Sequence, residues 1–290
     1  MATGEDYERV RRDIPQHIKV SVLLAHKYQD GETNPTGWWM SEKYDGVRAY
    51  WNGRCFYSRS GNAFYAPSWF TEDLPKDMDL DGELFVGRKK FQSIASIVKK
   101  SEPQLWEKVR YYVFDAPHLE EQPFETRMKA IKDYFDKAKP GYAKFVVHEK
   151  CTGSDHVDKE LKRIIDLGGE GLMIREPGSK YERKRSKTLL KIKKFHEAEA
   201  LVIGYEPSKS NKDLTGALKV QMANGKEFKV GTGLSKKDRK SPPKVETIIT
   251  YKFQEYTNSG KPRFPTYVGI RIDMTEPKDA EGVVTEATDD

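Results

Sequence analysis

A change in the spacing of apolar residues near residue 197 constrains the fold more than any other feature of this sequence. Before it, runs of aromatic and β-branched residues alternate with segments whose apolar residues recur at helical spacing. After it, about five short strand-like runs follow within roughly 75 residues. This change predicts an α+β (mixed α/β) domain with antiparallel sheets, followed by a smaller all-β domain.

The first domain is expected to contain hairpins and amphipathic helices. Asn52-Gly53 lies between two strand-like runs and predicts a two-residue hairpin turn, because both positions of that turn need a positive φ. Helical spacing of apolar residues predicts helices around 91–98, 124–135 and 157–165, and Gly168-Gly169 should end the last of them. The predicted strands span residues 47–51, 54–58, 78–86, 110–115, 172–174 and 189–193.

The second domain is expected to be a small barrel of the OB-fold type, since its short strands have the size and pattern of that fold. Its predicted strands span residues 200–204, 218–223, 227–230, 247–253 and 267–272, with Asn224-Gly225 as a hairpin turn. We place the first domain at 1–196 and the second at 197–275. Residues 276–290 are acidic and are expected to form a disordered tail.

Composition limits the partners and the compartment. The net charge of +6 and pI near 8.9 favour a polyanionic partner. Two cysteines, Cys55 and Cys151, are too few for a disulfide framework or a zinc site and indicate free thiols in a reducing compartment. No apolar run approaches the ~20 residues of a membrane span. We expect no membrane partner and an intracellular protein of the cytoplasm or nucleus, although a chain whose leader has been removed would look the same.

The segment 38–51 places Lys43 between apolar residues and beside Asp45-Gly46. A lysine can act as a nucleophile only where its surroundings disfavour the ammonium form, through burial or nearby positive charge. Trp38, Trp39 and Met40 could provide the apolar side of such a site. Taken alone, the same residues are more often a surface lysine beside a hairpin turn.

Five further segments supply what chemistry on ATP requires: cations for the phosphates, carboxylates for Mg²⁺ and the ribose, and a flat ring for the base. Each alone has a commoner explanation, such as a turn, a core strand or a solvated loop. The segments are Asp81-Gly82-Glu83, Tyr112-Val113-Phe114-Asp115, Gly169-Glu170-Gly171-Leu172-Met173-Ile174-Arg175, Leu190-Lys191-Ile192-Lys193 and 262–271.

In their order along the chain, these segments resemble the motifs of the covalent nucleotidyltransferases, the superfamily of DNA ligases, RNA ligases and mRNA capping enzymes. Lys43-x-Asp45-Gly46-x-Arg48 resembles motif I, and the five segments resemble motifs III, IIIa, IV, V and VI. The resemblance covers residues 20–272 and is closest to the minimal ATP-dependent DNA ligases, particularly the small bacterial Lig E type. It implies a nucleotidyltransferase (adenylation) domain followed by an OB-fold domain.

The resemblance implies a reaction in three steps, with ATP and Mg²⁺ (or Mn²⁺) as cofactors and nicked duplex DNA as the partner of a monomer. Lys43 would form lysyl-AMP, AMP would move to the 5′-phosphate at the nick, and the 3′-hydroxyl would displace it. The catalytic residues it implies are Lys43, Asp45, Arg48, Lys191 and Lys193. The nucleotide would be bound by Arg59, Glu83, Phe114, Arg185, Lys191, Lys193 and Arg271, and the metal ion by Glu83 and Glu170.

Two groups of alternatives remain open at this point. An mRNA capping guanylyltransferase or an RNA ligase would share motifs I, III, IV and V, and a non-catalytic OB-fold module could bind single-stranded nucleic acid with the same basic and aromatic residues. The sequence also departs from the viral minimal ligases, because 208–216 is only a short polar loop where they carry a longer hairpin. Basic segments at 180–194 and 235–244 would then provide much of the grip on DNA.

Overall fold

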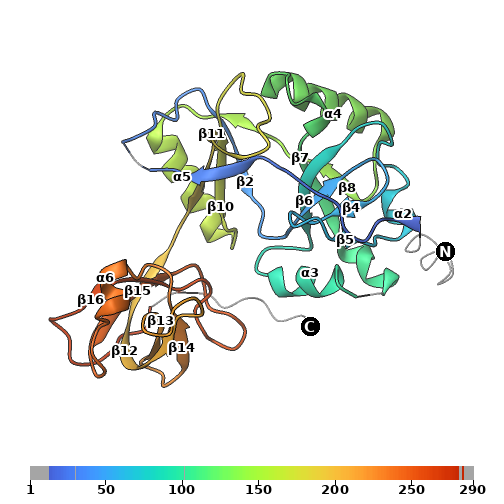
Figure 1. Ribbon diagram of the computed structural model, residues 1–290. Helices are drawn as coiled ribbons and strands as arrows, with labels where there is room; N and C mark the ends of the chain where they lie inside the picture. Colours follow the sequence, from blue (N-terminus) through green and yellow to red (C-terminus); the bar gives the residue numbers. More distant parts are fainter. Residues whose placement is uncertain (1–12, 30, 101, 281–282, 284–290) are drawn as a thin grey trace. The chain divides into compact units, whose positions relative to one another are not determined.

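The computed structural model describes residues 13–29, 31–100, 102–280 and 283. They form two compact units that divide between Lys193 and Lys194, called unit 1 and unit 2 below. Figure 1 labels the elements of both units. Two sheets belong to unit 1 and one to unit 2 among the described residues, so that the predicted α+β domain followed by an all-β domain is confirmed.

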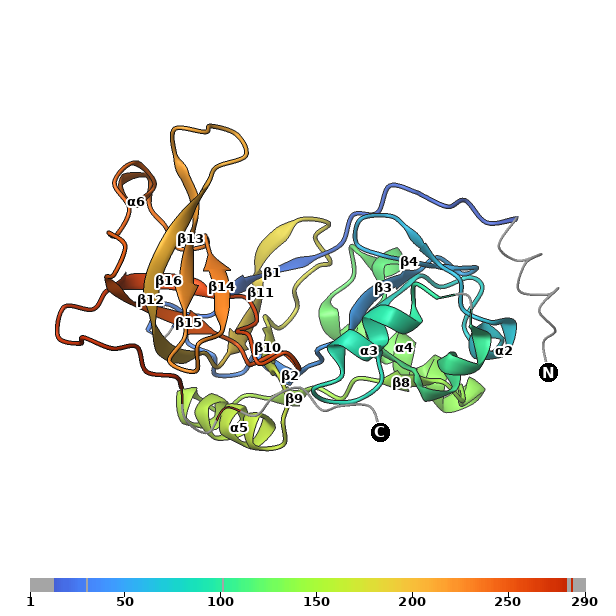
Figure 2. The same cartoon turned by 90° about the horizontal axis from the view of Figure 1, so that it is seen from below.

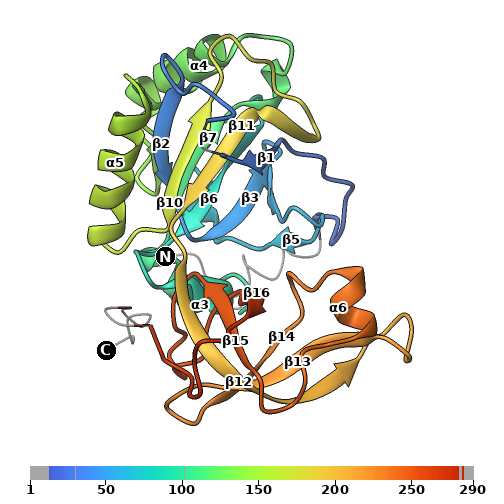
Figure 3. The ribbon, with the colours of Figure 1, turned by 90° about the vertical axis from the view of Figure 1, so that its left-hand side faces the viewer.

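The first sheet of unit 1 carries Lys43. Its strands lie in the order β1-β11-β10-β2-β9, and all pairs are antiparallel except β1 with β11, which is parallel. Helix α5 (Ser154–Asp166) lies against one face of this sheet (Figure 3). Its residues Val157 and Ile164 pack there with Met40, Leu172 and Ile174. The strands are β1 (Leu24–Lys27), β2 (Trp39–Lys43), β9 (Glu149–Lys150), β10 (Gly171–Arg175) and β11 (Arg185–Lys193).

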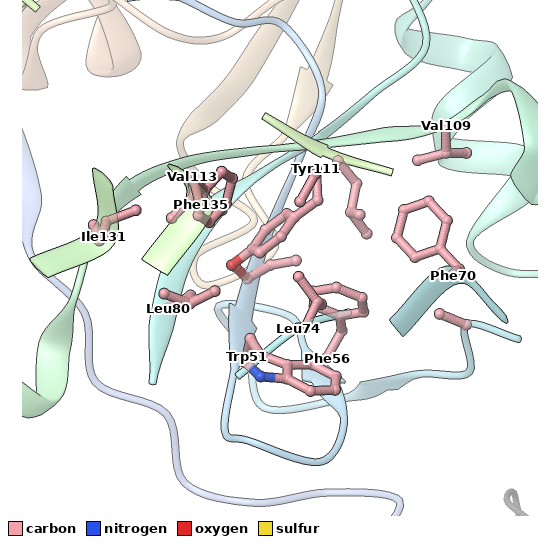
Figure 4. Packing of buried hydrophobic residues seen from close by; sticks show 14 of the residues in the cluster. Trp51, Phe56, Phe70, Leu74, Leu80, Val109, Tyr111, Val113, Ile131 and Phe135 are labelled. Carbon is pink, nitrogen blue, oxygen red and sulfur yellow. The ribbon is translucent and has the colours of Figure 1, made fainter. Parts of the chain in front are cut away.

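The second sheet of unit 1 has the order β5-β4-β3-β6-β7-β8, with β7 and β8 parallel. Its strands are β3 (Val47–Trp51), β4 (Phe56–Tyr57), β5 (Ala63–Phe64), β6 (Leu80–Phe85), β7 (Arg110–Asp115) and β8 (Ala143–Phe145). Aromatic side chains gather beneath it, and Figure 4 shows Trp51, Phe56, Phe70 and Tyr111 packed together. Short helices and turns surround this core: α2 (Ser68–Thr71), α3 (Phe91–Ile97), α4 (Phe124–Ala138) and 3₁₀ turns at Pro103–Lys108 and Pro117–Leu119.

Both predicted hairpins exist, but their turns differ from the two-residue type. Trp51 pairs with Phe56, so four residues connect β3 to β4, and the Asn52 side chain accepts hydrogen bonds from the amides of Arg54 and Cys55. Gly53 has a positive φ of 85°, whereas Asn52 is not among the non-glycine residues with positive φ. The prediction of a two-residue turn was wrong because the Asn52 side chain bonds to the backbone instead of adopting the left-handed conformation.

Unit 2 is a single sheet in the order β14-β13-β12-β15-β16 and is seen in Figure 2 in orange to red. Its strands are β12 (His196–Pro207), β13 (Thr215–Gln221), β14 (Glu227–Val230), β15 (Ile248–Phe253) and β16 (Thr266–Ile270), with α6 (Lys236–Lys240) between β14 and β15. The inward side chains of β12, β13 and β15 form its core. The five strands agree with the five predicted from the sequence.

The start of the predicted acidic tail belongs to unit 2. The Asp279 carboxylate accepts hydrogen bonds from the amides of Ala223 and Asn224, and the Lys278 carbonyl accepts one from the amide of Glu199. Residues 276–280 therefore differ from the expected disorder, because they cap the β13–β14 turn and the side of β12. The rest of the predicted tail, apart from Val283, lies outside the described residues.

Two further observations bear on the sequence predictions. Cys55 and Cys151 are both free and buried. Within the described residues, no helix combines the length and the apolar character needed to cross a bilayer.

Candidate active site

A cavity of about 250 Å³ in unit 1 collects most of the predicted site residues. Side chains of β2, β10 and β11 from the first sheet and of β3, β6 and β7 from the second contribute to its wall. The predicted site residues that line it are Lys43, Arg48, Arg59, Glu83, Phe114, Arg185 and Lys191.

The register of the first sheet explains why these side chains meet. In β10, Gly171 lies opposite Lys43 of β2 and Lys193 of β11, and Met173 lies opposite Ser41 and Lys191. Alternate side chains of a strand point to the same face, so the odd-numbered residues of these three strands face the cavity. The even-numbered apolar residues Met40, Leu172, Ile174, Leu190 and Ile192 pack in the cluster beneath α5. This alternation also divides the apolar run before Lys43, since Trp39 lines the cavity while Met40 packs beneath α5.

Lys43 ends β2 and is tied to a carboxylate. Its Nζ lies 2.5 Å from Oε2 of Glu170, the residue before β10, and Lys193 binds the other oxygen of the same carboxylate. The Glu170 side chain is 3% exposed. Burial opposes its ionisation, but the charges of Lys43 and Lys193 outweigh this and hold the pKa of the Glu170 carboxyl below its ordinary value.

Glu83 on β6 has the opposite electrostatic character. Burial raises the pKa of the Glu83 carboxyl to about 8, against the opposing charges of Lys43 and Arg48. The carboxylates of Glu170 and Asp45 add to the increase. A carboxyl with this pKa is mostly protonated at neutral pH, and a cation bound beside it would favour its ionised form.

Arg48 on β3 is fixed by a bidentate bond to a buried carboxylate. Its Nε and Nη2 donate to Asp81 at 2.9 and 2.5 Å, and the Tyr181 hydroxyl donates to Asp81 at 2.6 Å. The guanidinium also lies over the Phe114 ring, 5.5 Å from its centroid. Asp81 is fully buried, so the first residue of the Asp-Gly-Glu segment orients Arg48 instead of facing the cavity.

The remaining cations gather where β1 meets β11. Burial and the neighbouring charges of Lys193, Lys43 and Arg185 lower the pKa of Lys191. Arg185 begins β11 and donates to the Ala25 carbonyl at 2.5 Å. Several cations held this close to one another provide a site for an anion with several charges, such as a polyphosphate.

Two glycines allow the close approach on which this arrangement depends. A Cβ at Gly171 would lie 2.0 Å from the Ile192 carbonyl oxygen, so any side chain there would push β10 from β11. A Cβ at Gly46 would lie 2.1 Å from the Leu84 carbonyl oxygen, where the segment after Lys43 passes β6. Both glycines belong to segments that the sequence singled out.

Arg59 is placed by the N-terminal part of unit 1. It lies in a turn in which the amide of Ser58 donates to Asn62 at 2.7 Å, and the amide of Ile18 donates to Gly61 at 2.9 Å. The His17 ring contacts the Ser60 carbonyl at 2.9 Å. A segment more than 40 residues away in sequence therefore fixes the turn that carries Arg59.

Three predicted site residues do not line the cavity within unit 1. Glu170 binds Lys43, which lines the cavity, and Lys193 binds the same carboxylate. Asp45 lies close enough to Glu83 to affect the pKa of the Glu83 carboxyl. The remaining predicted residue, Arg271, belongs to unit 2, where its guanidinium pairs with Asp273 at 2.8 Å and Glu199 at 3.4 Å.

Sequence reasoning missed several residues of the cavity wall, among them Met173, His148 and Arg175. Met173 and Arg175 alternate with the buried residues of β10, so the period of two after Gly171 could have revealed them. His148 lies between β8 and β9 and carries no comparable signal. The predicted apolar contribution of Trp38 was wrong, because its side chain packs with the cluster beneath α5.

The carboxylates at the site determine which metal ion it could hold. Among the described residues, no group of three or more His, Cys, Asp and Glu side chains is placed to hold a metal ion. Mg²⁺ is commonly held by one or two carboxylates together with water and substrate phosphates. Glu83 and Glu170, close enough to influence each other's ionisation, fit that description.

Comparison with known proteins gives two family matches. Residues 23–193 match the ATP dependent DNA ligase domain, and residues 208–271 match the DNA ligase OB-like domain. A DNA ligase of Haemophilus influenzae is 38% identical over 247 residues, which is 85% of this chain and 90% of that protein. A DNA ligase of African swine fever virus is 26% identical over 74% of this chain and 55% of its own length.

Solved structures agree with these matches. A Lig E DNA ligase has a TM-score of 0.82 and 35% identity, covering 88% of this chain and all of the other. The Chlorella virus DNA ligase-adenylate has a TM-score of 0.53 and 25% identity, covering 87% of this chain and 99% of the other. The family matches span both units, and the chain belongs to the family of ATP-dependent DNA ligases.

Proposed function

We propose that this protein seals nicks in duplex DNA with ATP, and that Lys43 carries the AMP between the two substrates. The observation that supports this most directly is the position of Lys43 at a cavity that combines clustered cations with the Phe114 ring. A nucleotide needs both kinds of surface, since its phosphates are anionic and its base is flat.

In the first step, the Lys43 nitrogen would attack the α-phosphorus of ATP. A phosphorus–nitrogen bond forms, the bond to pyrophosphate breaks, and Lys43 gives up two of its three ammonium protons to solvent while one N–H stays on the nitrogen. Lys191 and Lys193 offset the negative charge of the reacting phosphate, and Phe114 stacks on the base. Because the reaction is a nucleotidyl transfer, positioning and charge neutralisation supply most of the acceleration.

In this step the Glu170 carboxylate would give up its ion pairs with Lys43 and Lys193. That carboxylate binds both lysines. Glu83 and Glu170 would hold Mg²⁺, which supplies positive charge to the phosphates when bound. A metal ion bound at Glu170 would compete with Lys43 and Lys193 for this carboxylate, and both lysines would then be able to contact phosphate oxygens.

In the second and third steps, AMP passes to the 5′-phosphate at the nick and is then displaced by the 3′-hydroxyl. Lys43 recovers its proton as the phosphorus–nitrogen bond breaks. Arg48 and Arg59 would hold the ribose or the 5′-phosphate, and Asp45 would place the 3′-hydroxyl. Arg185 lines the same cavity and would contact a phosphate.

We also propose a role for each region of the chain in this reaction. Unit 1 corresponds to the adenylation domain, predicted at 1–196, and unit 2 to the OB-fold domain, predicted at 197–275. Arg271, with Arg263 as the second candidate, would contact the pyrophosphate of ATP. The protein would act on nicked duplex DNA as a monomer.

The test is the sealing of a duplex whose nick carries a radioactive 5′-phosphate, with ATP and Mg²⁺, resolved on a denaturing gel. We expect a ligated product from the natural protein and none from Lys43→Ala, which should also fail to acquire label from α-labelled ATP. Lys129→Ala is the matched control, because Lys129 is an exposed lysine on α4 that pairs only weakly with Asp133.

Failure to seal would be informative only for a folded sample. If the natural protein neither ligates nor forms adenylated DNA while its circular dichroism is that of a folded protein, the proposal fails. If Lys43→Ala still becomes labelled with AMP, Lys43 is not the nucleophile.

A further inference from the structure

Two polar side chains of the cavity, His148 and Arg175, have no part in the proposed reaction. Arg175 lies four residues along β10 from Gly171, the residue opposite Lys43, which is about 13 Å at the usual rise of a strand. Asp115 follows Phe114 in β7 and binds Arg175 at 2.8 Å, so Phe114 and Arg175 belong to the same end of the cavity. A nucleotide with its α-phosphate at Lys43 would extend its base toward this end.

The hydrogen-bonding character of His148 follows from its surroundings. Its Nδ1 lies 3.0 Å from the Val146 carbonyl oxygen, which can only accept, so Nδ1 carries the proton. Burial and the charge of Arg175 lower the pKa of His148 to about 4, and the ring is neutral at pH 7. The other nitrogen, Nε2, is therefore a hydrogen-bond acceptor.

Arg175 provides the complementary donor. A single ring, that of Phe124, contacts both side chains: the Arg175 guanidinium lies 4.7 Å and the His148 ring 5.0 Å from its centroid. The Nε of Arg175 makes no hydrogen bond within the part of the chain that is described. A guanidinium only donates, so an acceptor and a donor are held side by side at the end of the cavity that would receive the base.

We propose that His148 and Arg175 select adenine in the nucleotide, with His148 Nε2 accepting from the 6-amino group and Arg175 donating to a neighbouring ring nitrogen. The inference rests on the proposed function of the same cavity. Guanine carries an oxygen in place of the amino group and would set this acceptor against the lone pair of Nε2. An arginine alone would favour guanine, whose O6 and N7 both accept, so His148 is the discriminating residue.

The test compares nucleotides in the labelling of Lys43. The rate of adenylation is measured with ATP, with GTP and with purine riboside triphosphate, which lacks the 6-amino group. We expect the natural protein to prefer ATP to the purine analogue about tenfold in kcat/KM, since a buried acceptor loses its partner. His148→Phe keeps a ring beside Phe124 but removes the acceptor, so that preference should fall to about twofold, and GTP should gain relative to ATP.

The controls separate this inference from the proposed function. His156→Ala is the matched histidine variant, since His156 lies on α5 and does not line the cavity, and its preference should equal that of the natural protein. Equal use of ATP and the purine analogue by the natural protein would overturn the inference without any variant. An unchanged preference in a folded His148→Phe or His148→Ala would do the same, whereas a natural protein that no nucleotide labels would refute the proposed function instead.

Discussion

Two carboxylates of the site, Glu83 and Glu170, have pKa values shifted in opposite directions by their surroundings. Two lysines bind Glu170 and favour its charged form, whereas burial dominates at Glu83 and favours the neutral form. Pairs of carboxyl groups shifted apart in this way are typical of sites that handle charge during a reaction. At the scale of the residue, Glu83 therefore favours its neutral form under conditions in which Glu170 is charged.

The raised pKa of Glu83 predicts a dependence of stability on pH. An unfolded glutamate loses its proton near pH 4.5, while the folded one holds it to about pH 8. The proton thus stabilises the folded state fully below pH 4.5, and this contribution falls by up to about 1.4 kcal/mol per pH unit until pH 8. Glu83→Gln should be more stable than the natural protein at pH 8, with a smaller advantage at pH 5, in urea unfolding.

A matched control isolates the effect of that carboxyl. Glu72→Gln changes an exposed glutamate of the same unit, and its stability relative to the natural protein should be the same at both pH values. If Glu83→Gln has an equal advantage at pH 5 and pH 8, Glu83 ionises normally in the folded protein.

At the scale of the element, the junction of β2, β10 and β11 carries the nucleophile. Lys43, Gly171 and Lys193 occupy one row across three strands, so any change in strand spacing moves all of the charged groups together. Gly171 has a φ of 156° and no room for a Cβ beside the Ile192 carbonyl.

Gly171→Ala should therefore reduce both stability and activity. The new methyl group would separate β10 from β11, at a cost of about 2–4 kcal/mol in the free energy of unfolding, and AMP labelling of Lys43 should fall more than tenfold. Denaturant unfolding and the labelling assay measure the two effects. Gly269→Ala is the control for stability, because nothing lies within 4 Å of its Cβ position, and a similar loss there would refute the steric explanation.

Most of this junction could be predicted from the sequence, because strand period and motif spacing are local properties. The period of two in Leu190-Lys191-Ile192-Lys193 is enough to place both lysines on one face of β11, and Gly171, at the start of β10, belongs to a segment that the sequence singled out. The contact between Lys43 and Glu170, 127 residues apart, could not be derived from such local patterns. His148 was missed for the same reason, since its position depends on the packing of Phe124 from another element.

At the scale of the whole molecule, the basic segment at 180–194 contacts more acidic groups than its composition suggests. Lys180 pairs with Glu121 at 2.7 Å, Arg183 with Glu120, and Lys184 with Glu182 at 3.2 Å. These pairs are largely exposed and thus contribute little, so phosphates can replace the carboxylates. Local sequence patterns do not reveal the pairs of Lys180 and Arg183, because their acidic partners at 120 and 121 lie some 60 residues away.

Binding of nicked duplex DNA should therefore weaken steeply with salt. If about five phosphates are contacted, the affinity should fall several-hundredfold between 50 and 200 mM salt. Fluorescence anisotropy with a labelled nicked duplex measures this dependence. An affinity that stays constant over that range would show that cations of this segment do not contact the backbone.

Arg271 should affect only the part of the reaction that involves pyrophosphate. Arg271→Ala is expected to lose at least tenfold in AMP labelling from ATP while still sealing a nick that already carries AMP, because no pyrophosphate takes part in that step. The control is Lys212→Ala, which changes an exposed lysine in the loop between β12 and β13. Arg239→Ala would not serve, because the Arg239 guanidinium donates hydrogen bonds to three backbone carbonyls of unit 2. Equal losses in both assays would assign Arg271 a structural role.

The pairing of β1 with β11 and of β2 with β10 also determines when the site can exist during synthesis. The strand that carries Lys43 can pair with β9 once Lys150 has been made, but it pairs with β10 only after Gly171 has been made, and Leu24 finds Arg185 later still. Contacts between such distant residues form slowly, since a long loop must close before any of them contributes. A growing chain therefore carries its nucleophile for well over a hundred residues as an ordinary amine, and a ribosome that stops early releases a product without an active site.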